Sequence, residues 1–155
     1  MPDIFIRPFA TGDEIAFRDI NLEWIERYFA VEPKDREVLS DPRKYILDPG
    51  GAILMAMDGD HAVGAVALMV IDEGSVELAK MGVRPAAQGR GAGRMLVAAA
   101  IEHARAMGMQ RVYIETNSVL GPALKLYRDA GFLPLRERIP SPYARSDVQL
   151  ELILG

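Results

Sequence analysis

The chain has 155 residues, a usual length for one domain, and we expect a single domain over residues 1–155. It has no cysteine, which excludes disulfides, zinc–thiolate sites and a cysteine nucleophile. Eighteen basic and 22 acidic side chains give a net charge of −4, which argues against nucleic acid as a partner. The longest apolar runs, such as residues 62–71, are too short to cross a bilayer, and we see no signal peptide. We therefore expect a cytoplasmic protein with no membrane partner.

The first third of the chain predicts one strand followed by helices. Residues 4–8 have the apolar character of a strand. Thr11 is a candidate N-cap for a helix whose apolar residues recur at helical spacing over residues 15–29. Pro33 and Pro42 then divide the chain into a short helix and a connector.

The next segment predicts a meander of three antiparallel strands. Two apolar runs, residues 52–57 and 62–71, are joined by an Asp-Gly turn at residues 58–61, which is a strong hairpin signal. A second turn at residues 72–74 leads to a third strand at residues 75–83.

The second half alternates helices and strands. A glycine-rich stretch at residues 89–93 precedes a helix with apolar residues on one face over residues 96–104. A strand at residues 111–116 and a helix at residues 120–127 follow. Two more strands are predicted at residues 132–138 and 147–154, with a proline-containing loop between them. The pattern predicts one mixed α/β domain.

The glycine-rich stretch is the most informative motif. It joins a strand to a helix, so backbone amides and the positive end of the helix can face an anion. Arg90 and Arg94 could add charge, and so small a basic cluster suits a phosphate-bearing small molecule. A Walker loop is excluded because Arg94 and Met95 follow Gly93. A dinucleotide fingerprint fails because its third glycine would fall at position 94.

The remaining pattern, with Gln88, Gly91 and Gly93 after Val-x-Pro, resembles the acetyl-CoA-binding loop Gln/Arg-x-x-Gly-x-Gly/Ala of the GCN5-related N-acetyltransferase (GNAT) superfamily. The resemblance is most specific over residues 77–132 and continues more loosely over the whole chain. It implies an α/β (α+β) fold with a twisted, mostly antiparallel mixed sheet of about seven strands, flanked by about four helices. It also implies an N-acetyltransferase that uses acetyl-CoA as co-substrate and needs no metal.

The resemblance further implies where the cofactor binds. Its contacts come from the strand before the loop, the loop and helix start, the end of the next strand, and the following helix. The matching residues here are Met81, Val83, Gln88, Gly89, Arg90, Gly91, Ala92, Gly93, Arg94, Asn117 and Tyr127. Asn117 is equally suited to cap the helix that follows it.

Two residues are candidates for catalysis by the same resemblance. Tyr127 matches the tyrosine that protonates the departing thiolate, although it could instead be a core residue on its helix face. Glu77 is the candidate base, with the alternative that it pairs with Lys80 on the sheet. We expect Glu115 to face solvent or to pair with a neighbouring strand.

The acceptor is expected to be a primary amine of a small molecule or a protein. By resemblance its pocket draws on Trp24, Tyr28, Phe29, Tyr45 and the loop at residues 141–146. Arg145 in that loop could bind an acceptor carboxylate. A non-catalytic acyl-CoA-binding module, or a transferase for a longer acyl group, is the alternative. A homodimer is possible.

Overall fold

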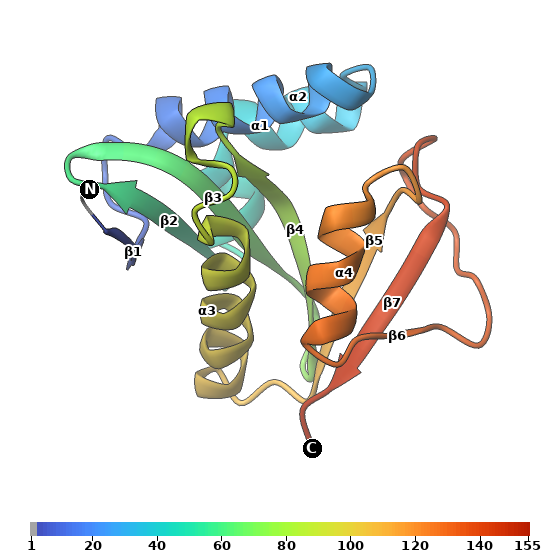
Figure 1. The fold of residues 1–155 in the computed structure, drawn as a ribbon. Helices are drawn as coiled ribbons and strands as arrows, with labels where there is room; N and C mark the ends of the chain where they lie inside the picture. Colours follow the sequence, from blue (N-terminus) through green and yellow to red (C-terminus); the bar gives the residue numbers. More distant parts are fainter. Residues whose placement is uncertain (1–2) are drawn as a thin grey trace.

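A computed structural model, which describes residues 3–155, shows a seven-stranded sheet in the order β1-β2-β3-β4-β5-β7-β6 (Figure 1). Neighbouring strands are antiparallel except for β4 and β5, which are parallel. The strands are β1 (Ile4–Pro8), β2 (Ala52–Asp58), β3 (His61–Asp72), β4 (Ser75–Val83), β5 (Arg111–Thr116), β6 (Leu133–Pro134) and β7 (Val148–Ile153). The expected meander and the mostly antiparallel sheet are confirmed.

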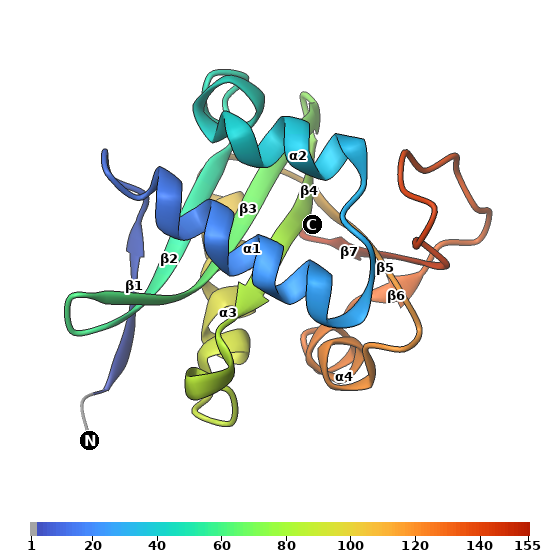
Figure 2. The ribbon, with the colours of Figure 1, turned by 90° about the horizontal axis from the view of Figure 1, so that it is seen from above.

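Helices cover both faces of this sheet. α1 and α2 lie on one face, and α3 and α4 lie on the other (Figures 1 and 2). Their bounds are α1 (Glu14–Tyr28), α2 (Pro33–Ser40), α3 (Ala92–Ala106) and α4 (Gly121–Asp129), with a π-helical turn at Arg43–Leu47 and a 3₁₀ turn at Pro85–Ala87. None of the helices within residues 3–155 has the length and apolar character needed to cross a membrane.

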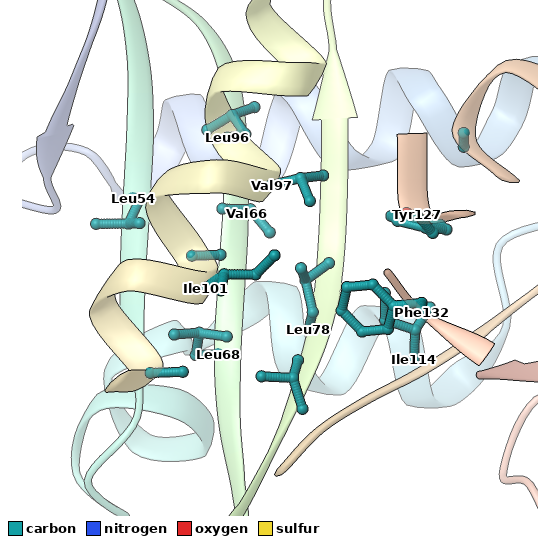
Figure 3. Close-up of a cluster of buried hydrophobic side chains, with 14 of the residues drawn as sticks. Leu54, Val66, Leu68, Leu78, Leu96, Val97, Ile101, Ile114, Tyr127 and Phe132 are labelled. Atoms are coloured by element: carbon teal, nitrogen blue, oxygen red, sulfur yellow. The ribbon is translucent and has the colours of Figure 1, made fainter. Parts of the chain in front are cut away.

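The two helical layers explain why the central strands are apolar along their whole length. Successive side chains of a strand point to opposite faces. Leu54 of β2 therefore packs in the cluster beneath α3, while Ile53 and Met55 pack in the cluster beneath α1. Figure 3 shows the α3 side of this core, with Leu96 and Ile101 directed toward the strands. Because both faces are buried, β2 and β3 read as continuous apolar runs instead of alternating ones.

A bulge distorts β4 in its second half. Ala79 and Gly82 of β4 lie opposite Ala67 and Ala65 of β3, so three steps along β4 match two along β3. Lys80, inside the bulge, has φ of +51°, an unusual value for a residue with a side chain. A bulge bends its strand and redirects the side chains within it.

The parallel pairing of β4 with β5 ends just before this bulge. It runs from Ser75 opposite Arg111 to Glu77 opposite Tyr113 and goes no further. The remaining part of each strand is therefore available to line a site between them. A Cβ on Gly82 would lie 3.1 Å from the Cβ of Trp24, so this glycine lets α1 approach β4 closely.

The expected N-cap of the first helix is wrong. α1 begins at Glu14, and the preceding Asp13 takes its place without a capping side-chain bond. Instead, the Asp13 carboxylate accepts hydrogen bonds from the amide of Ala10 at 2.8 Å and from Arg7 at 2.6 Å. The ion pair of Arg7 with Asp13 thus fixes the turn before α1, where the sequence pattern had favoured Thr11 as the N-cap.

The strand expected at residues 132–138 is present but much shorter, because among the described residues only Leu133 and Pro134 of this segment pair with β7. The chain beyond Leu135 is held by side chains instead of a strand ladder. The Gln149 side chain exchanges two hydrogen bonds with the backbone of Ile139, at 2.9 and 2.7 Å, and Arg138 donates to the carbonyl of Asp147. These local bonds satisfy the backbone in a long loop between β6 and β7.

Candidate active site

The glycine-rich loop places several amide groups where an anion could bind. Gly89 and Gly91 have φ of +81° and +82°, a conformation that glycine adopts readily and other residues rarely do. The loop ends at the N-terminus of α3. Among residues 3–155, the amide N–H groups of Gly89, Gly91, Ala92 and Gly93 have no hydrogen-bond acceptor. Free N–H groups at a helix N-terminus fit a diphosphate group, as the resemblance implied.

A cavity of about 430 Å³ adjoins this loop. It is lined by Trp24 and Tyr28 from α1, Met81 and Val83 from β4, the loop itself, and residues at the start of α4. Seven of the residues expected to bind cofactor are among its walls: Met81, Val83, Gln88, Gly89, Gly91, Gly93 and Arg94.

The other four expected contacts, Arg90, Ala92, Asn117 and Tyr127, do not line this cavity with their side chains. The Arg90 guanidinium forms an ion pair with Asp58 at 2.7 Å, and Ala92 is buried in the core beneath α3. Arg94 reaches the cavity wall but also pairs with Asp129 at 3.1 Å. Asn117 and Tyr127 line a second cavity instead.

The second cavity, of about 110 Å³, lies where the pairing of β4 with β5 stops. Its walls come from α1, β4, β5, α4 and the loop between β6 and β7. Both cavities are lined by Trp24, Met81, Leu120 and Ala123, so they adjoin one another. A ligand held at the glycine-rich loop could therefore extend into the second cavity.

Tyr127 lies on α4 at the inner wall of the second cavity. Tyr127 is 5% exposed, and its ring centroid lies 6.0 Å from that of Phe132 in an edge-to-face arrangement. Figure 3 shows the two residues side by side. Its hydroxyl makes no hydrogen bond with any residue between positions 3 and 155. Burial raises the pKa of Tyr127, which keeps the hydroxyl protonated and able to donate.

Glu77 faces the same cavity from β4. Burial, followed by the negative charge of Glu115, raises the pKa of Glu77 to about 7, while Lys80 opposes the shift. Its carboxylate has no ion pair or hydrogen bond within the described part of the chain. The expected alternative, pairing with Lys80, is wrong because the Lys80 ammonium lies 2.8 Å from Asp35.

Glu115 lines the cavity as well and is not the solvent-facing residue that we expected. Its two oxygens accept hydrogen bonds from the hydroxyls of Tyr113, at 3.0 Å, and Ser141, at 2.8 Å. The loop that supplies Ser141 is far away in sequence, so nothing in the strand pattern of β5 indicated this arrangement.

A buried cluster of charges closes one side of the second cavity. Asp35 of α2, which is 0% exposed, accepts hydrogen bonds from Lys80 and from both terminal nitrogens of Arg145. Burial alone would raise the pKa of Asp35, but the hydrogen bonds from Arg145 and Lys80 outweigh it and lower the value to about 2. Arg145 also pairs with Glu32 at 3.3 Å. Since its guanidinium is engaged by two carboxylates, the structure does not support Arg145 as the ligand of an acceptor carboxylate.

The other residues expected around the acceptor are divided between several places. Trp24 and Phe29 line the second cavity, whereas Tyr28 lines only the first. Tyr45 lines neither, and the ammonium groups of Lys34 and Lys44 lie 5.5 and 5.1 Å from the centroid of its ring. Asn117 accepts from the amide of Val119 and donates to the carbonyl of Arg145, so it fixes the turn before α4 and the facing loop.

Comparisons with known proteins agree with this geometry. The profile of the acetyltransferase (GNAT) family matches residues 17–132. The mycothiol acetyltransferase of Saccharopolyspora erythraea is 31% identical over 137 residues, which cover 84% of this chain and 44% of that protein. The chain thus spans less than half the length of this curated relative.

Solved structures share the fold. An acetyltransferase of the GNAT family from Staphylococcus aureus superposes with a TM-score of 0.88 at 18% identity, covering 98% of this chain and 99% of that one. The yncA protein of Salmonella typhimurium, solved with its cofactor acetyl-CoA, has a TM-score of 0.76 at 20% identity, covering 98% and 94%. The seven-stranded sheet, its glycine-rich loop and the profile match together show that the chain belongs to the acetyltransferase (GNAT) family.

Proposed function

We propose that this protein is an N-acetyltransferase that transfers the acetyl group of acetyl-CoA to a primary amine by direct attack in a ternary complex. The observation that carries the proposal is the junction of two cavities, one at the unpaired amides of the glycine-rich loop and one that contains Glu77 and Tyr127. The first suits a diphosphate-bearing cofactor, and the second offers a base and a proton donor.

The cofactor would be held along the wall of the larger cavity. Amides of Gly89, Gly91 and Gly93 would bind its diphosphate, and the β4 backbone at Met81 and Val83 would contact its arm. Acetyl-CoA would supply the thioester carbonyl that the amine attacks and the thiolate that leaves. The amide of Met81, which lies in the bulge outside the strand register, is the candidate donor to that carbonyl.

Glu77 is proposed as the base for the amine. An alkylamine with a pKa near 10.4 is almost wholly protonated at pH 7, so forming the reactive neutral amine costs about 4.6 kcal/mol. A glutamate with an ordinary pKa would be a poor base for this step. The raised pKa of Glu77, about 7, makes its carboxylate a stronger base by about 3 kcal/mol.

Tyr127 is proposed as the donor to the leaving sulfur. A thiol has a pKa of about 8.5 and a tyrosine about 10, so the ordinary transfer is uphill by about 2 kcal/mol. Burial makes full transfer harder but secures a neutral hydroxyl next to the junction of the cavities. A positioned hydrogen bond to the developing thiolate is therefore its main contribution.

The test is release of free coenzyme A from acetyl-CoA across a panel of amines and amino acids, in wild type and Tyr127→Phe. The absence of cysteine keeps a thiol-reactive readout clean. We expect acceptor-dependent release that falls sharply in the variant. Tyr45→Phe is the matched control, because Tyr45 lines neither cavity.

Other outcomes separate the alternatives. Binding of acetyl-CoA without release for any acceptor would favour a non-catalytic acyl-CoA-binding module. Faster release from a longer acyl-CoA would make this a transferase for that group. Equal release in wild type and Tyr127→Phe would remove the role of Tyr127 and leave the transferase proposal intact. The cytoplasmic location and the homodimer stay predictions.

A further inference from the structure

The second cavity contains two carboxylates that lack a cation. Lys80 and Arg145 carry the positive charges near it, and both are paired, with Asp35 and, for Arg145, also with Glu32. Within residues 3–155, Glu77 and Glu115 form no ion pair. Once the paired charges cancel, these two glutamates are the acidic groups of the cavity that no cation of the described residues compensates.

The sheet places the two glutamates on one face. Glu77 lies opposite Tyr113 in the parallel pairing of β4 with β5, and side chains directly opposite share a face. Glu115 is two residues beyond Tyr113, which puts it on that same face. Both side chains line the second cavity.

The two glutamates differ in what holds them. Glu115 receives hydrogen bonds from two hydroxyls, those of Tyr113 and Ser141, which fix the position of its carboxylate. Glu77 has no such donors among the described residues and is free to gain and lose a proton. The pair therefore combines one carboxylate that is held in place with one that can exchange a proton.

We propose that the acceptor is a small aliphatic amine with a second ammonium group, which Glu115 binds while Glu77 deprotonates the amine that reacts. The proposal rests on the transferase function proposed above and specifies its substrate class. The two glutamates would thus have separate partners on one acceptor.

The proton balance explains why a second cation is useful. The reacting ammonium gives one proton to the Glu77 carboxylate, which becomes neutral. The amine then forms the C–N bond as the C–S bond breaks, and its second proton goes to the departing sulfur. Glu115 takes no part in these transfers, and a nearby half-buried carboxylate favours the cationic form of a lone amine. A second ammonium beside Glu115 compensates that charge.

The polar groups around Glu77 and Glu115 are compatible with a bound ammonium group. The Lys80 ammonium is directed to Asp35 and to the hydroxyl of Tyr143, both at 2.8 Å. The hydroxyl of Ser146 is buried at the wall of the same cavity and has no hydrogen-bond partner among the described residues. A buried unpaired hydroxyl is costly, and an ammonium N–H would satisfy it.

The test compares putrescine with n-butylamine, which share a four-carbon chain and differ in one amine. Coenzyme A release is measured for wild type, Glu115→Gln and a control, Glu151→Gln. Glu151 is a sheet glutamate on β7 that pairs with Arg111 outside both cavities. We expect wild type to favour putrescine in kcat/KM, and Glu115→Gln to raise the KM for putrescine about tenfold, equivalent to about 1.4 kcal/mol. The butylamine rate should change little, and the control should resemble wild type.

A second readout does not need turnover. Calorimetry of putrescine with the coenzyme A complex should show binding that weakens about tenfold in Glu115→Gln, provided that thermal melts show both proteins folded. Equal use of the two amines by wild type, or an equal loss for both in Glu115→Gln, would overturn the inference while the transferase function stands. The inference would also be overturned if other amines support coenzyme A release while putrescine neither binds nor supports release. No release with any amine would count against the function itself.

Discussion

The Nζ of Lys80 lies 2.8 Å from Oδ1 of Asp35 and joins the bulge of β4 to a helix 45 residues earlier in the chain. The side chains of the two residues are only 5% and 0% exposed. Arg145 meets the same carboxylate from the loop between β6 and β7. One acidic group thus connects α2 to two segments that line the second cavity, β4 and the loop between β6 and β7. Lys80 also has an unusual backbone conformation, with φ of +51°.

Asp35→Ala should destabilise the protein strongly. The change leaves the buried Lys80 without its carboxylate and leaves Arg145 with Glu32 alone. Removing one member of a buried ion pair typically costs 3–5 kcal/mol, so we expect a loss of about 3–5 kcal/mol in the free energy of unfolding. Urea denaturation measures it. As a control, Asp19→Ala removes an exposed ion pair with Arg18 and should cost less than about 1 kcal/mol. Similar values for the two variants would show that Asp35 does not organise these segments.

Gly91→Ala should weaken cofactor binding more than it affects folding. An alanine at φ of +82° is strained by about 1–2 kcal/mol, although no atom obstructs the new Cβ. The altered loop should misplace the amides at the start of α3 and raise the KM for acetyl-CoA. Gly12→Ala is the matched control, because Gly12 also has a positive φ and open space but lies in the turn before α1. An equal effect of both variants on KM would contradict a role for the loop amides.

The sequence predicted most of this fold because its signals are local. Apolar runs and the Asp-Gly turn predict the β2–β3 hairpin, and the glycines after β4 predict the loop before α3. The failures occur where hydrogen bonds of polar side chains, and not the apolar pattern, decide the backbone. Thr11 does not cap α1, because the ion pair of Arg7 with Asp13 fixes the turn before the helix. The strand expected at residues 132–138 ends early, and hydrogen bonds from the Gln149 side chain hold the chain that follows.

The part of the site that a short sequence motif forms could be predicted, and the part that distant segments form could not. Met81 and Val83 of β4 and most of the predicted residues of the glycine-rich loop line one cavity, and they are close in sequence. The roles of Glu115 and Asp35 in the cavity and its charge cluster were not predicted. Each acquires its environment from a segment more than 25 residues away, and no periodicity in the sequence reports such contacts.

Tyr127→Phe should lower kcat by about a hundredfold and leave the KM for acetyl-CoA nearly unchanged. The hydroxyl donates only as the sulfur leaves, so its loss affects the transition state more than binding. Stopped assays of coenzyme A release at saturating cofactor measure kcat. Because the hydroxyl makes no hydrogen bond to the described residues, the variant should melt at or above the wild-type temperature. A lower melting temperature together with an unchanged kcat would instead indicate that the hydroxyl serves the stability of the fold and not the reaction.

Glu77→Gln should abolish the rise of kcat/KM with pH that wild type shows around pH 7. The base must be deprotonated, and the pKa of Glu77 is about 7, so the wild-type rate should increase as pH rises through that value. The variant should be slower at every pH and lack this step. A wild-type profile without a transition near pH 7, or a variant that keeps it, would assign the step to another group.

The same substitution should stabilise the folded protein at high pH. The folded pKa of Glu77, about 7, lies above the ordinary value of 4.5, so the folded state binds more protons between these values. Wild-type stability therefore falls as pH rises from about 4.5 to 7, by about 3 kcal/mol for the difference between the two pKa values, and this penalty persists above pH 7. Glutamine has no charge to desolvate. Urea denaturation should show Glu77→Gln more stable than wild type at pH 8, and the difference should shrink toward its minimum at pH 4. A gap that is constant with pH would mean that Glu77 is solvated, and its role as a tuned base would lose its physical basis.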